Sequence, residues 1–579
     1  MKNTLFDFVK WGWSDRSDPR SSQGKGSPLN VAATCVSPRG TARRPIVVVC
    51  AILAATCGGK GEQPPTSTLT CPADQIACGE QCIAMTTMNC GGCGIPCSTG
   101  QICQSGSCQC TDGVLCNGDC VPPDANPCGT TETSSTLVTS APDAYWKTDG
   151  QLTDATGSAS VTVNETATAQ TWEGFGGSFN EMGWSYLSML SPSDRDAAIH
   201  LLYGADGARF VFGRIPIGAS DYAMSRYTLD ETADDTSLTG FSIDRDKQWL
   251  IPFIKAAQAV KANIRFWASP WTPPTWMKQA PFSPGNAVSP FDGGSMKDDD
   301  ATMTAFAQYL VKFVQAYALQ GIPIEAVSAQ NEPNYTGNYP TCAWTPAIYT
   351  KFVGQYLGPA VASAGLTTRV MLGTFNGGGS DPAIVSSVMG DATARSFINV
   401  LGFQWGMVSR VANARAYNLP IWQSEHKCGN YPWMTPFNAT LAPNDQVYAV
   451  ESWGLIRDWI KAGVTAYSAW NMVLDTVGVG IDTTRVWPQD ALLTVDTSTK
   501  TLNITPTYYV FRHFSQFVAQ GAKVVSTSGG DAVAFKNPDG SMVVVLYNSG
   551  SAKTMTVARS AVKLQFAMPG HGWATVVMR

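Results

Sequence analysis

The sequence predicts an α/β protein whose main part is an eight-stranded (β/α) barrel. Eight short apolar or β-branched runs alternate with segments of helical periodicity such as residues 303–320 and 446–463. Several runs end on a polar residue, as barrel strands do where they carry a site. No run leads into a GxGxxG or P-loop motif, and the GFGG of the first run is a weak signal, so a doubly wound open sheet is the less favoured alternative. The runs are residues 173–179, 210–218, 263–270, 324–332, 369–376, 399–406, 419–425 and 464–470.

The first part of the chain, residues 1–57, is predicted to be an N-terminal extension with a targeting segment. Residues 43–57 have a dibasic start, an apolar run and small residues at the end, which is the layout of a secretory signal. The run is too short to span a bilayer. A long polar stretch precedes it, so we expect an over-extended translation start. Its end, LAATC, resembles a bacterial lipoprotein box in which Cys57 would be lipidated, although Leu53 and Thr56 depart from that pattern; plain secretion is the alternative.

Residues 58–128 are predicted to form a disulfide-rich module, because they hold twelve of the 17 cysteines of the chain. An even number at short spacing behind a secretory signal indicates a disulfide framework. A zinc site at Cys90 and Cys93 is disfavoured, since no second CxxC follows at finger spacing. The module resembles Cys-rich repeats in exported proteins of predatory soil bacteria, and we expect a spacer or an adhesion unit. The Thr- and Ser-rich residues 129–142 are predicted to be a linker.

Composition and charge exclude several classes of function. A net charge of −5 argues against nucleic-acid binding, and 18 Trp, 18 Tyr and 23 Phe with only 14% charged residues are typical of a rigid extracellular protein with aromatic clefts that suit sugars. The chain has four His and no HxH or HExxH spacing, so no His-based metal site and no cofactor is expected. A Ser hydrolase is disfavoured because no GxSxG motif is present. Acid–base chemistry is therefore expected from carboxylates.

Two of the eight runs end on glutamate, at Glu332 and Glu425. They are 93 residues apart, which fits three βα units of about thirty residues each. Runs four and seven lie nearly opposite in an eight-strand ring, so the two carboxyls can face each other across the mouth, as glycoside hydrolysis requires. The alternative is that each is an ordinary solvated strand end. The other polar or aromatic strand ends are Arg214, Asn376, Gln404 and Trp470.

The motifs around these residues resemble glycoside hydrolase family 30. SAQNEP with IWQSE looks like a clan A retaining glycosidase, and the match extends from about residue 143 to 579 through WEGFGGSFNEMGW, GRIPIGASDYAMSRYTLDE, WASPWTPPTWMK, AWNMVLD and TYYVFRHFSQFVAQGAKVV. The family contains glucosylceramidases, β-xylosidases, endo-β-1,6-glucanases and related endo-galactanases and xylanases. The resemblance implies a β-sandwich beside the barrel, with its joining strands in 143–170, the barrel in 171–502 and the C-terminal sandwich in 503–579. Residues 158–164, 531–550 and 563–579 are the expected sandwich strands.

The resemblance also implies roles for individual residues. Glu332 would be the general acid/base and Glu425 the nucleophile of a double displacement with net retention. Asn331 is expected to hydrogen-bond the sugar 2-OH, and Arg214 to hydrogen-bond Glu425 and keep it ionised. Trp470, Trp267 and Trp271 are expected to form the floor and walls around the reacting sugar, with core packing as the alternative for each.

The sequence departs from the family pattern at two places. Many members place an acidic residue that grips sugar hydroxyls after the first strand; this chain has Asn180-Glu181, so either side chain is a candidate. Strand six ends in Gln404-Trp405 instead of a pattern with His or Tyr, so this wall of the sugar site is expected to differ. His426, directly after the proposed nucleophile, is a further candidate.

Cys342 and Cys428 are the only cysteines of the predicted barrel. We predict a disulfide between them across the rim, with two free buried thiols as the alternative.

The sequence thus predicts a secreted or cell-surface, monomeric retaining β-glycosidase acting on an external β-glucan, with endo-β-1,6-glucanase activity favoured. Secretion and the Cys-rich module favour a polymer over an intracellular glycolipid. Glucosylceramidase-like, β-xylosidase and endo-β-1,6-galactanase activities are alternatives. A non-catalytic carbohydrate-binding or adhesion protein is the alternative of another class, and the presence of both glutamates argues against it.

Overall fold

The computed structural model describes residues 134–282 and 289–579, and the backbone of six short strands between residues 75 and 121. These six strands pair as three antiparallel two-stranded sheets: β1 (Gln75–Cys78) with β2 (Gln81–Ala84), β3 (Gln101–Gln104) with β4 (Ser107–Cys110), and β5 (Val114–Cys116) with β6 (Asp119–Val121). The predicted targeting segment, Cys57 and the disulfide framework lie outside the described residues. Among the residues described, none of the helices is both long and apolar enough to cross a membrane.

The predicted barrel is confirmed, and each of the eight runs forms one of its strands. All neighbouring strands are parallel, and the last strand pairs with the first to close the ring. The strands are β11 (Gly174–Ser178), β12 (Phe212–Ile217), β13 (Arg265–Pro270), β16 (Ile324–Ser328), β17 (Arg369–Phe375), β18 (Ile398–Gln404), β19 (Ile421–Glu425) and β20 (Ala466–Asn471). Gly176 explains the GFGG of the first strand, because a Cβ there would lie 2.2 Å from the carbonyl oxygen of Phe212.

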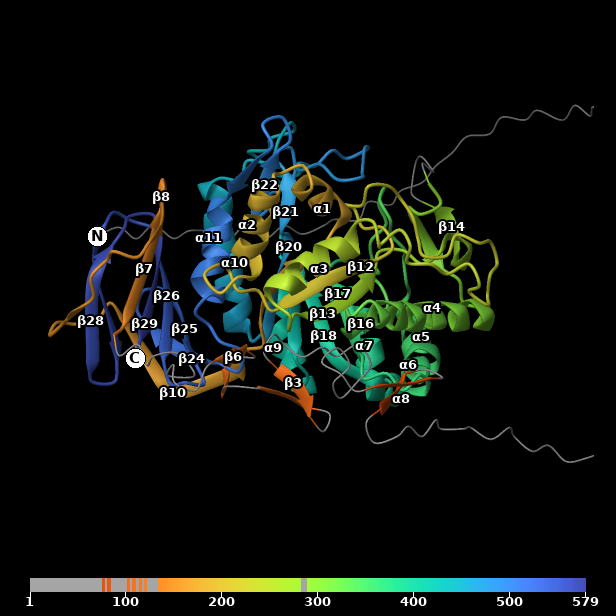
Figure 1. Cartoon of the computed structure of the whole chain (residues 1–579), viewed down its shortest axis with the longest axis horizontal. Helices are drawn as coiled ribbons and strands as arrows, with labels where there is room; N and C mark the ends of the chain where they lie inside the picture. The colour runs from red at the N-terminus through yellow and green to blue at the C-terminus, as the bar shows by residue number, and fades with distance from the viewer. Residues whose placement is uncertain are drawn as a thin grey trace, which may run out of the picture. The chain divides into compact units, whose positions relative to one another are not determined.

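Helices surround the barrel strands (Figure 1). They are α1 (Glu181–Leu187), α2 (Pro192–Tyr203), α3 (Leu250–Val260), α4 (Asp300–Leu319), α5 (Pro346–Phe352), α6 (Gly358–Ser363), α7 (Asp381–Gly390), α8 (Ala392–Phe397), α9 (Val408–Ala414) and α10 (Gln446–Ala462). The two helices predicted from periodicity are α4 and α10. Side chains cap both: Asp299 accepts a hydrogen bond from the Thr302 amide, and Asp445 accepts from the Val447 and Tyr448 amides. Gly463 ends α10 in a left-handed conformation.

The interior of the barrel is a packed aromatic and aliphatic core. Phe212, Trp267, Met371 and Trp422 belong to one buried cluster, and the rings of Phe212 and Trp422 lie 5.0 Å apart between centroids. Such side-chain layers fill the inside of a (β/α) barrel and leave the site to the strand ends. Trp267 therefore belongs to the core, which was the alternative expectation for it.

Ten strands form the second sheet, which corresponds to the predicted β-sandwich. Their order is β8-β7-β29-β26-β25-β24-β10-β27-β28-β9. Their bounds are β7 (Thr136–Ala141), β8 (Ala144–Lys147), β9 (Thr153–Asp154), β10 (Val161–Thr171), β24 (Lys523–Ser528), β25 (Asp531–Lys536), β26 (Met542–Asn548), β27 (Lys553–Arg559), β28 (Val562–Met568) and β29 (Gly572–Met578). The predicted linker is thus partly wrong, because its second half forms β7 and pairs with β29.

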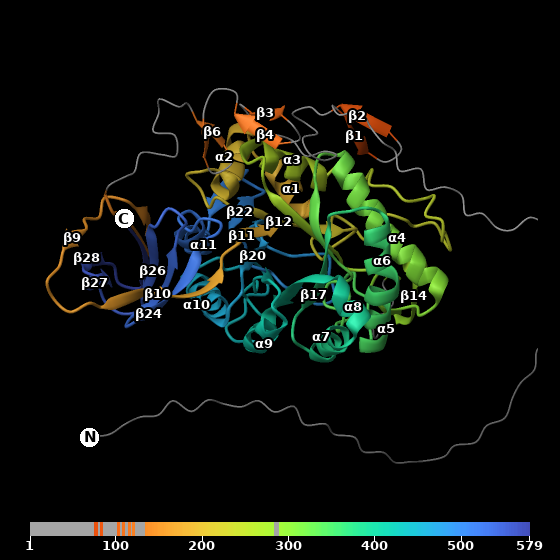
Figure 2. The same cartoon turned by 90° about the horizontal axis from the view of Figure 1, so that it is seen from below.

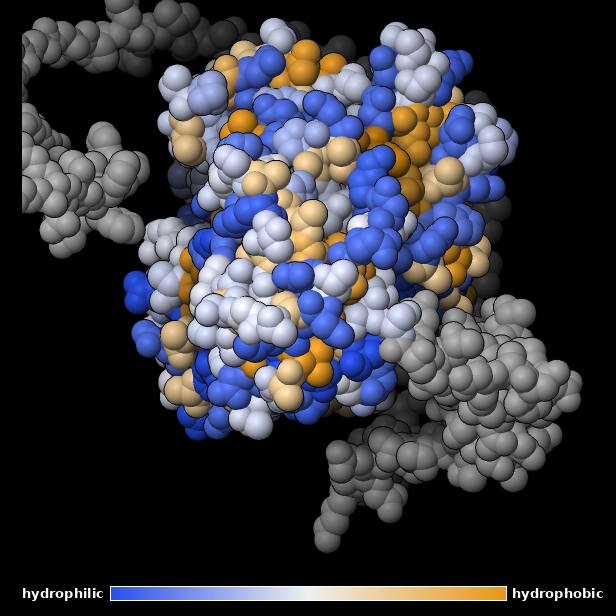
Figure 3. All heavy atoms as spheres, turned by 90° about the vertical axis from the view of Figure 1, so that its left-hand side faces the viewer, coloured by the Kyte–Doolittle hydropathy of each residue, from blue (hydrophilic) through white to orange (hydrophobic). Residues whose placement is uncertain are grey.

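The sandwich packs against the barrel through a shared core (Figure 2). The Trp172 and Phe535 rings lie 5.6 Å apart, and Trp453 of α10 donates a hydrogen bond from its indole nitrogen to Asp531 at 2.9 Å. The first part of the segment predicted as C-terminal sandwich is instead helix α11 (Pro506–Ser515), which packs on α10. The outer end of the sandwich carries mainly hydrophilic residues with scattered apolar ones (Figure 3).

Candidate active site

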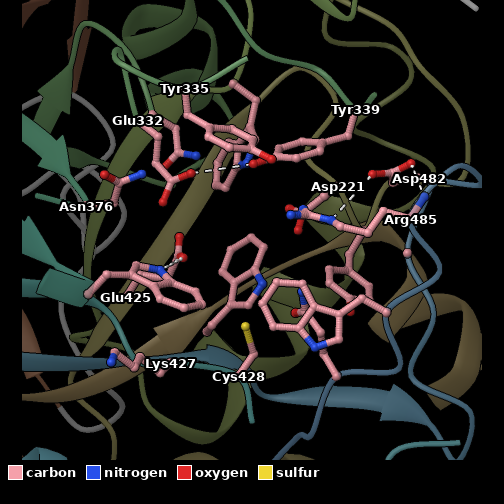
Figure 4. Close-up of a pocket in the computed structure, with 18 of the residues that line it drawn as sticks. Asp221, Glu332, Tyr335, Tyr339, Asn376, Glu425, Lys427, Cys428, Asp482 and Arg485 are labelled. Atoms are coloured by element: carbon pink, nitrogen blue, oxygen red, sulfur yellow. Dashed lines mark hydrogen bonds and ion pairs between the residues drawn. The ribbon is translucent and has the colours of Figure 1, made fainter. Parts of the chain in front are cut away.

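Glu332 and Glu425 line one cavity of about 360 Å³ at the C-terminal ends of the barrel strands. Glu425 is the last residue of β19, and Glu332 follows β16 by four residues. The chain turns there: the Asn331 amide donates to the Pro270 carbonyl, the Glu332 amide donates to the Thr374 carbonyl, and Glu332 has a left-handed φ of 48°. This bent backbone brings Glu332 to the mouth, where Figure 4 shows its carboxyl facing that of Glu425.

Arg214 of β12 supports Glu425 from below the cavity. Its side chain is fully buried, and Nη1 donates to Oε2 of Glu425 at 2.6 Å. The other carboxylate oxygen accepts a hydrogen bond from the indole nitrogen of Trp405 at 2.9 Å. The cost of burying the guanidinium is offset by this pair and by the face of Trp271, whose ring centroid lies 4.3 Å from Cζ. Both oxygens of Glu425 are therefore held by donors, which favours an ionised, fixed carboxylate.

Glu332 has a different environment. Its Oε1 accepts a hydrogen bond from Nε2 of Gln404 at 3.0 Å, and Tyr339 Oη lies 3.5 Å from its Oε2. Ser424 donates to the amide oxygen of Gln404 and so fixes which end of that amide faces Glu332. Burial, and next the negative charge of Glu425, raise the pKa of Glu332 to about 7. One carboxyl is thus suited to carry a proton near neutral pH, while the other is paired with a cation.

Asn331 is held with its amide oxygen turned away from the cavity. That oxygen accepts hydrogen bonds from Arg214 Nη2 at 2.7 Å and from Thr374 Oγ1 at 2.8 Å. Asn331 lines the cavity, so its amide nitrogen is left to donate to a bound molecule.

Aromatic rings form the floor of the cavity. Trp271 and Trp470 both line it and are stacked, with centroids 5.3 Å apart and planes inclined by 25°. Tyr222 packs edge-on against Trp470 at 6.1 Å. Flat apolar surfaces with a few fixed polar groups above them are typical of sites for sugars and other amphipathic rings.

Asp221 is a third carboxyl of the cavity, and sequence reasoning missed it. It lies four residues after the end of β12, and its Oδ1 is buried without a hydrogen-bond partner. Burial, and next the charge of Glu425, raise the pKa of Asp221 to about 8. Its carbonyl oxygen accepts a hydrogen bond from the Ile481 amide at 2.7 Å, which ties this loop to the one after β21 (Val473–Asp475). The sequence shows only that an aspartate follows the predicted second strand. It lies too far beyond the strand for the strand pattern to indicate that its side chain faces the cavity.

Other cavity residues come from long loops whose course the sequence did not predict. Figure 4 shows Arg485 reaching toward Asp221 at the end of the pocket away from the two glutamates. Besides glycines, the remaining lining residues that were missed are Tyr222, Tyr335, Tyr339, Lys427, Trp433, Asp482, Trp487 and Gln489.

Comparison with known proteins agrees with this geometry. The family model described as the glycosyl hydrolase family 30 TIM-barrel domain matches residues 172–518, and that of the family 30 beta sandwich domain matches residues 521–576. The chain belongs to glycoside hydrolase family 30. It is therefore a glycoside hydrolase, and the alternative of a non-catalytic binding protein is not supported.

Two curated relatives within family 30 have different named activities. An endo-1,6-beta-D-glucanase of Neurospora crassa is 27% identical over 456 residues, which cover 72% of this chain and 86% of the relative. The lysosomal acid glucosylceramidase of Mus musculus is 27% identical over 442 residues, covering 70% of this chain and 81% of the relative. A solved structure, the endo-beta1,6-glucanase BT3312, has a TM-score of 0.66 and 24% identity, covering 76% of this chain and 99% of its own; at this identity the likeness shows the fold.

The family-based expectation for Asn180 and Glu181 is wrong. Asn180 is the N-cap of α1 and accepts a hydrogen bond from the Gly183 amide at 2.6 Å. Glu181 is buried, accepts from the Met224 amide and forms an ion pair with the half-buried Arg245 at 2.9 Å. Neither residue lines the cavity, because both side chains are used to hold α1 and the loop after β12.

Two further candidates lie outside the cavity. His426 is enclosed behind the barrel wall, where its ring nitrogens contact Tyr467 Oη at 2.6 Å and Ser452 Oγ at 2.9 Å. Burial lowers the pKa of His426 to about 3, so the ring is neutral and structural. Trp267 points into the barrel core instead of the sugar site.

Arg214 and Gln404 act from behind the carboxyls and do not line the cavity. Both are fully buried, and each contacts a different glutamate. Arg214 hydrogen-bonds Glu425 as predicted, whereas Gln404, expected in the wall of the sugar site, lies behind Glu332 instead. Both are positioning residues. Asn331, Asn376, Trp271, Trp405 and Trp470 do line the cavity, as predicted.

The predicted disulfide is wrong, because Cys342 and Cys428 are both free and buried. Cys342 packs in the main core, whereas Cys428 lies in the aromatic cluster under the cavity. Burial raises the pKa of Cys342 to about 12. That they are the only two cysteines of the barrel does not bring them into contact.

Within residues 134–282 and 289–579, no group of three or more His, Cys, Asp or Glu side chains could hold a metal ion.

Proposed function

We propose that this family 30 enzyme is a retaining endo-β-1,6-glucanase. The observation that carries the proposal is the unequal pair of carboxyls in one cavity, with Glu425 bound to Arg214 and Glu332 held near a pKa of about 7. A general acid beside an ionised nucleophile is the arrangement that double displacement needs.

In the proposed mechanism, protonated Glu332 donates its proton to the glycosidic oxygen while Glu425 attacks C1. The resulting glycosyl ester removes the negative charge of Glu425, so the pKa of Glu332 falls and the carboxylate can take a proton from the incoming water. Asn331 donates from its amide nitrogen to the 2-OH of the reacting sugar, since Arg214 and Thr374 already occupy its oxygen. Trp271 and Trp470 support the ring face.

The linkage is supported by the relatives and by the predicted export. The endo-1,6-beta-D-glucanase of Neurospora crassa aligns over most of its length, and a secretory-type segment with a Cys-rich module suits an external polymer. Glucosylceramidase activity is the second candidate, because the mouse enzyme is equally similar at 27% identity. β-Xylosidase and endo-β-1,6-galactanase activities are further outcomes of the test.

Chromatography of products from β-1,6-glucan, β-1,3-glucan, β-1,6-galactan, xylan and glucosylceramide tests the substrate. Oligosaccharides of several lengths from β-1,6-glucan are the expected result, and release of glucose from glucosylceramide alone would reject the glucanase. Glu332→Gln and Glu425→Gln should each lose at least a hundredfold in rate. If both variants kept the wild-type rate, the assigned roles would be wrong. NMR of the first anomer formed tests retention.

We also propose that the enzyme is exported as a monomer and is either secreted or attached to the cell surface through a lipidated Cys57. Residues 43–57 and the Cys-rich residues 58–128 support this proposal. Lipid labelling of the wild type and of Cys57→Ala separates the two: loss of label in the variant indicates attachment, and label in neither indicates plain secretion.

A further inference from the structure

Trp433 is an exposed tryptophan at the edge of the catalytic cavity. It lies on the loop between β19 and α10, eight residues after Glu425, and 57% of its surface is exposed although it lines the cavity. A large exposed aromatic side chain beside a binding cavity marks a surface that another molecule covers.

The loop that carries Trp433 is held in place before any substrate binds. Its neighbour Asn430 donates from Nδ2 to the Pro488 carbonyl at 2.7 Å, and the indole of Trp487 donates to the Gly429 carbonyl at 3.1 Å. The rings of Trp433 and Trp487 meet edge-to-face with centroids 5.0 Å apart. A contact surface fixed in advance loses little conformational entropy on binding.

Cationic side chains lie next to the aromatic rings. Arg485 Cζ is 5.5 Å from the centroid of the Trp487 ring, and Lys427 Nζ is 5.9 Å from that of Trp405. The Nε of Arg485 is buried without a hydrogen-bond partner, and the nearest oxygen of Asp482 is 3.9 Å away. Figure 4 shows Arg485 extending into the pocket toward Asp221.

This combination suits a pyranose ring better than an alkyl chain. A pyranose offers a C–H face for an aromatic ring and hydroxyl groups at its edge for Arg or Lys donors. An alkyl chain would cover the same rings while leaving the donors beside it dehydrated and unpaired. The polar partners therefore argue for a sugar as the occupant.

We propose that Trp433 and Trp487, with Arg485, form a second sugar subsite, which binds the neighbouring glucosyl residue of the chain whose bond is cleaved. The inference rests on the proposed glucanase activity and deepens it. It makes the enzyme select for oligomers, because a substrate with one sugar leaves the subsite empty.

The test compares Trp433→Ala with Met434→Ala as the matched control. Met434 is on the same loop and 55% exposed, but it does not line the cavity. For each full-length protein, kcat/KM is measured on a β-1,6-linked glucotetraose and on β-glucosyl fluoride, which carries one sugar. Covering one face of an indole is worth about tenfold in kcat/KM. We expect the tetraose-to-fluoride ratio of kcat/KM to fall about tenfold in Trp433→Ala, to be partly restored in Trp433→Phe and to stay at the wild-type value in Met434→Ala.

Each other outcome has a distinct meaning. An unchanged ratio in Trp433→Ala would overturn the subsite and leave the glucanase proposal intact. An equal loss of kcat/KM on both substrates would also overturn the subsite, because it indicates a structural role for Trp433. If the wild type turns over the fluoride but not the tetraose, the glucanase proposal fails and the glucan occupant fails with it.

Discussion

Replacing Glu425 by Gln should lower the pKa of Glu332. The side chain of Gln keeps the shape of Glu but removes the negative charge that, after burial, contributes most to the raised pKa of about 7. The positive charge of Arg214 remains, and with its ion pair gone it favours ionised Glu332 more strongly. The variant also imitates the charge state of the glycosyl–enzyme, in which Glu425 is esterified.

The size of the shift follows from Coulomb's law. Carboxyls of a retaining glycosidase lie about 5 Å apart. At that separation, with an effective dielectric constant of about 20, two charges interact by about 3 kcal/mol, or about two pKa units. We therefore expect the pKa of Glu332 to fall from about 7 to about 5 in Glu425→Gln, while burial keeps it above the value of a free glutamate.

A titration of ¹³C-labelled glutamate by NMR measures this pKa, with the signal assigned by its loss in Glu332→Gln. Asp221→Asn is the control: the pKa of Asp221 is about 8, so Asp221 is mostly neutral while Glu332 titrates, and removing it should change the pKa of Glu332 little. A pKa of Glu332 that stayed near 7 in Glu425→Gln would refute the electrostatic coupling and leave burial as the whole cause.

Three further predictions concern the neighbours of the two carboxyls. Gln404→Leu removes a hydrogen bond that favours ionised Glu332, so its pKa should rise and the alkaline limb of the kcat/KM profile, where the acid loses its proton, should move to higher pH; a limb moved to lower pH would contradict this. Trp405→Phe keeps an aromatic ring but removes the donor to Glu425, and kcat/KM should fall about tenfold to a hundredfold, whereas an unchanged value would mean that this hydrogen bond does not matter. Trp267→Ala should lower the free energy of unfolding by about 3–5 kcal/mol in denaturant titrations, because the side chain is buried in the barrel core. A stability equal to that of the wild type would contradict the placement of Trp267 in the core.

The barrel was predictable because its strands are buried on both faces and so appear as nearly continuous apolar runs. Each predicted run matches one strand within a few residues. The largest difference is in the fourth run, residues 324–332, because strand β16 already ends at Ser328. Those residues continue the pattern but turn at the strand end, where the backbone bonds to both neighbouring strands. The β7 strand was missed because its Thr and Ser residues suit a linker as well as a sheet.

Residues at strand ends were predicted better than residues on loops. Glu332, Glu425 and Trp470 could be found because the barrel places strand ends at one mouth. Asp221 and Trp433 are brought there by loops, which carry no periodic signal. The interpretation of Asn180 failed for another reason: a capping role for α1 competes for the same side chain, and the sequence does not show which of the two is used.

The roles of the two glutamates are set by their partners and not by their strands. Both lie at the C-terminal ends of apolar strands, and both are nearly buried, with Glu332 9% and Glu425 6% exposed. Arg214 lies directly against Glu425, while the hydrogen-bond donors to Glu332, Gln404, Asn376 and Tyr339, are neutral. Burial disfavours the charge on both, but only Glu425 has a cation in contact to offset it. Arg214, within the second strand, therefore decides which carboxyl attacks and which carries the proton.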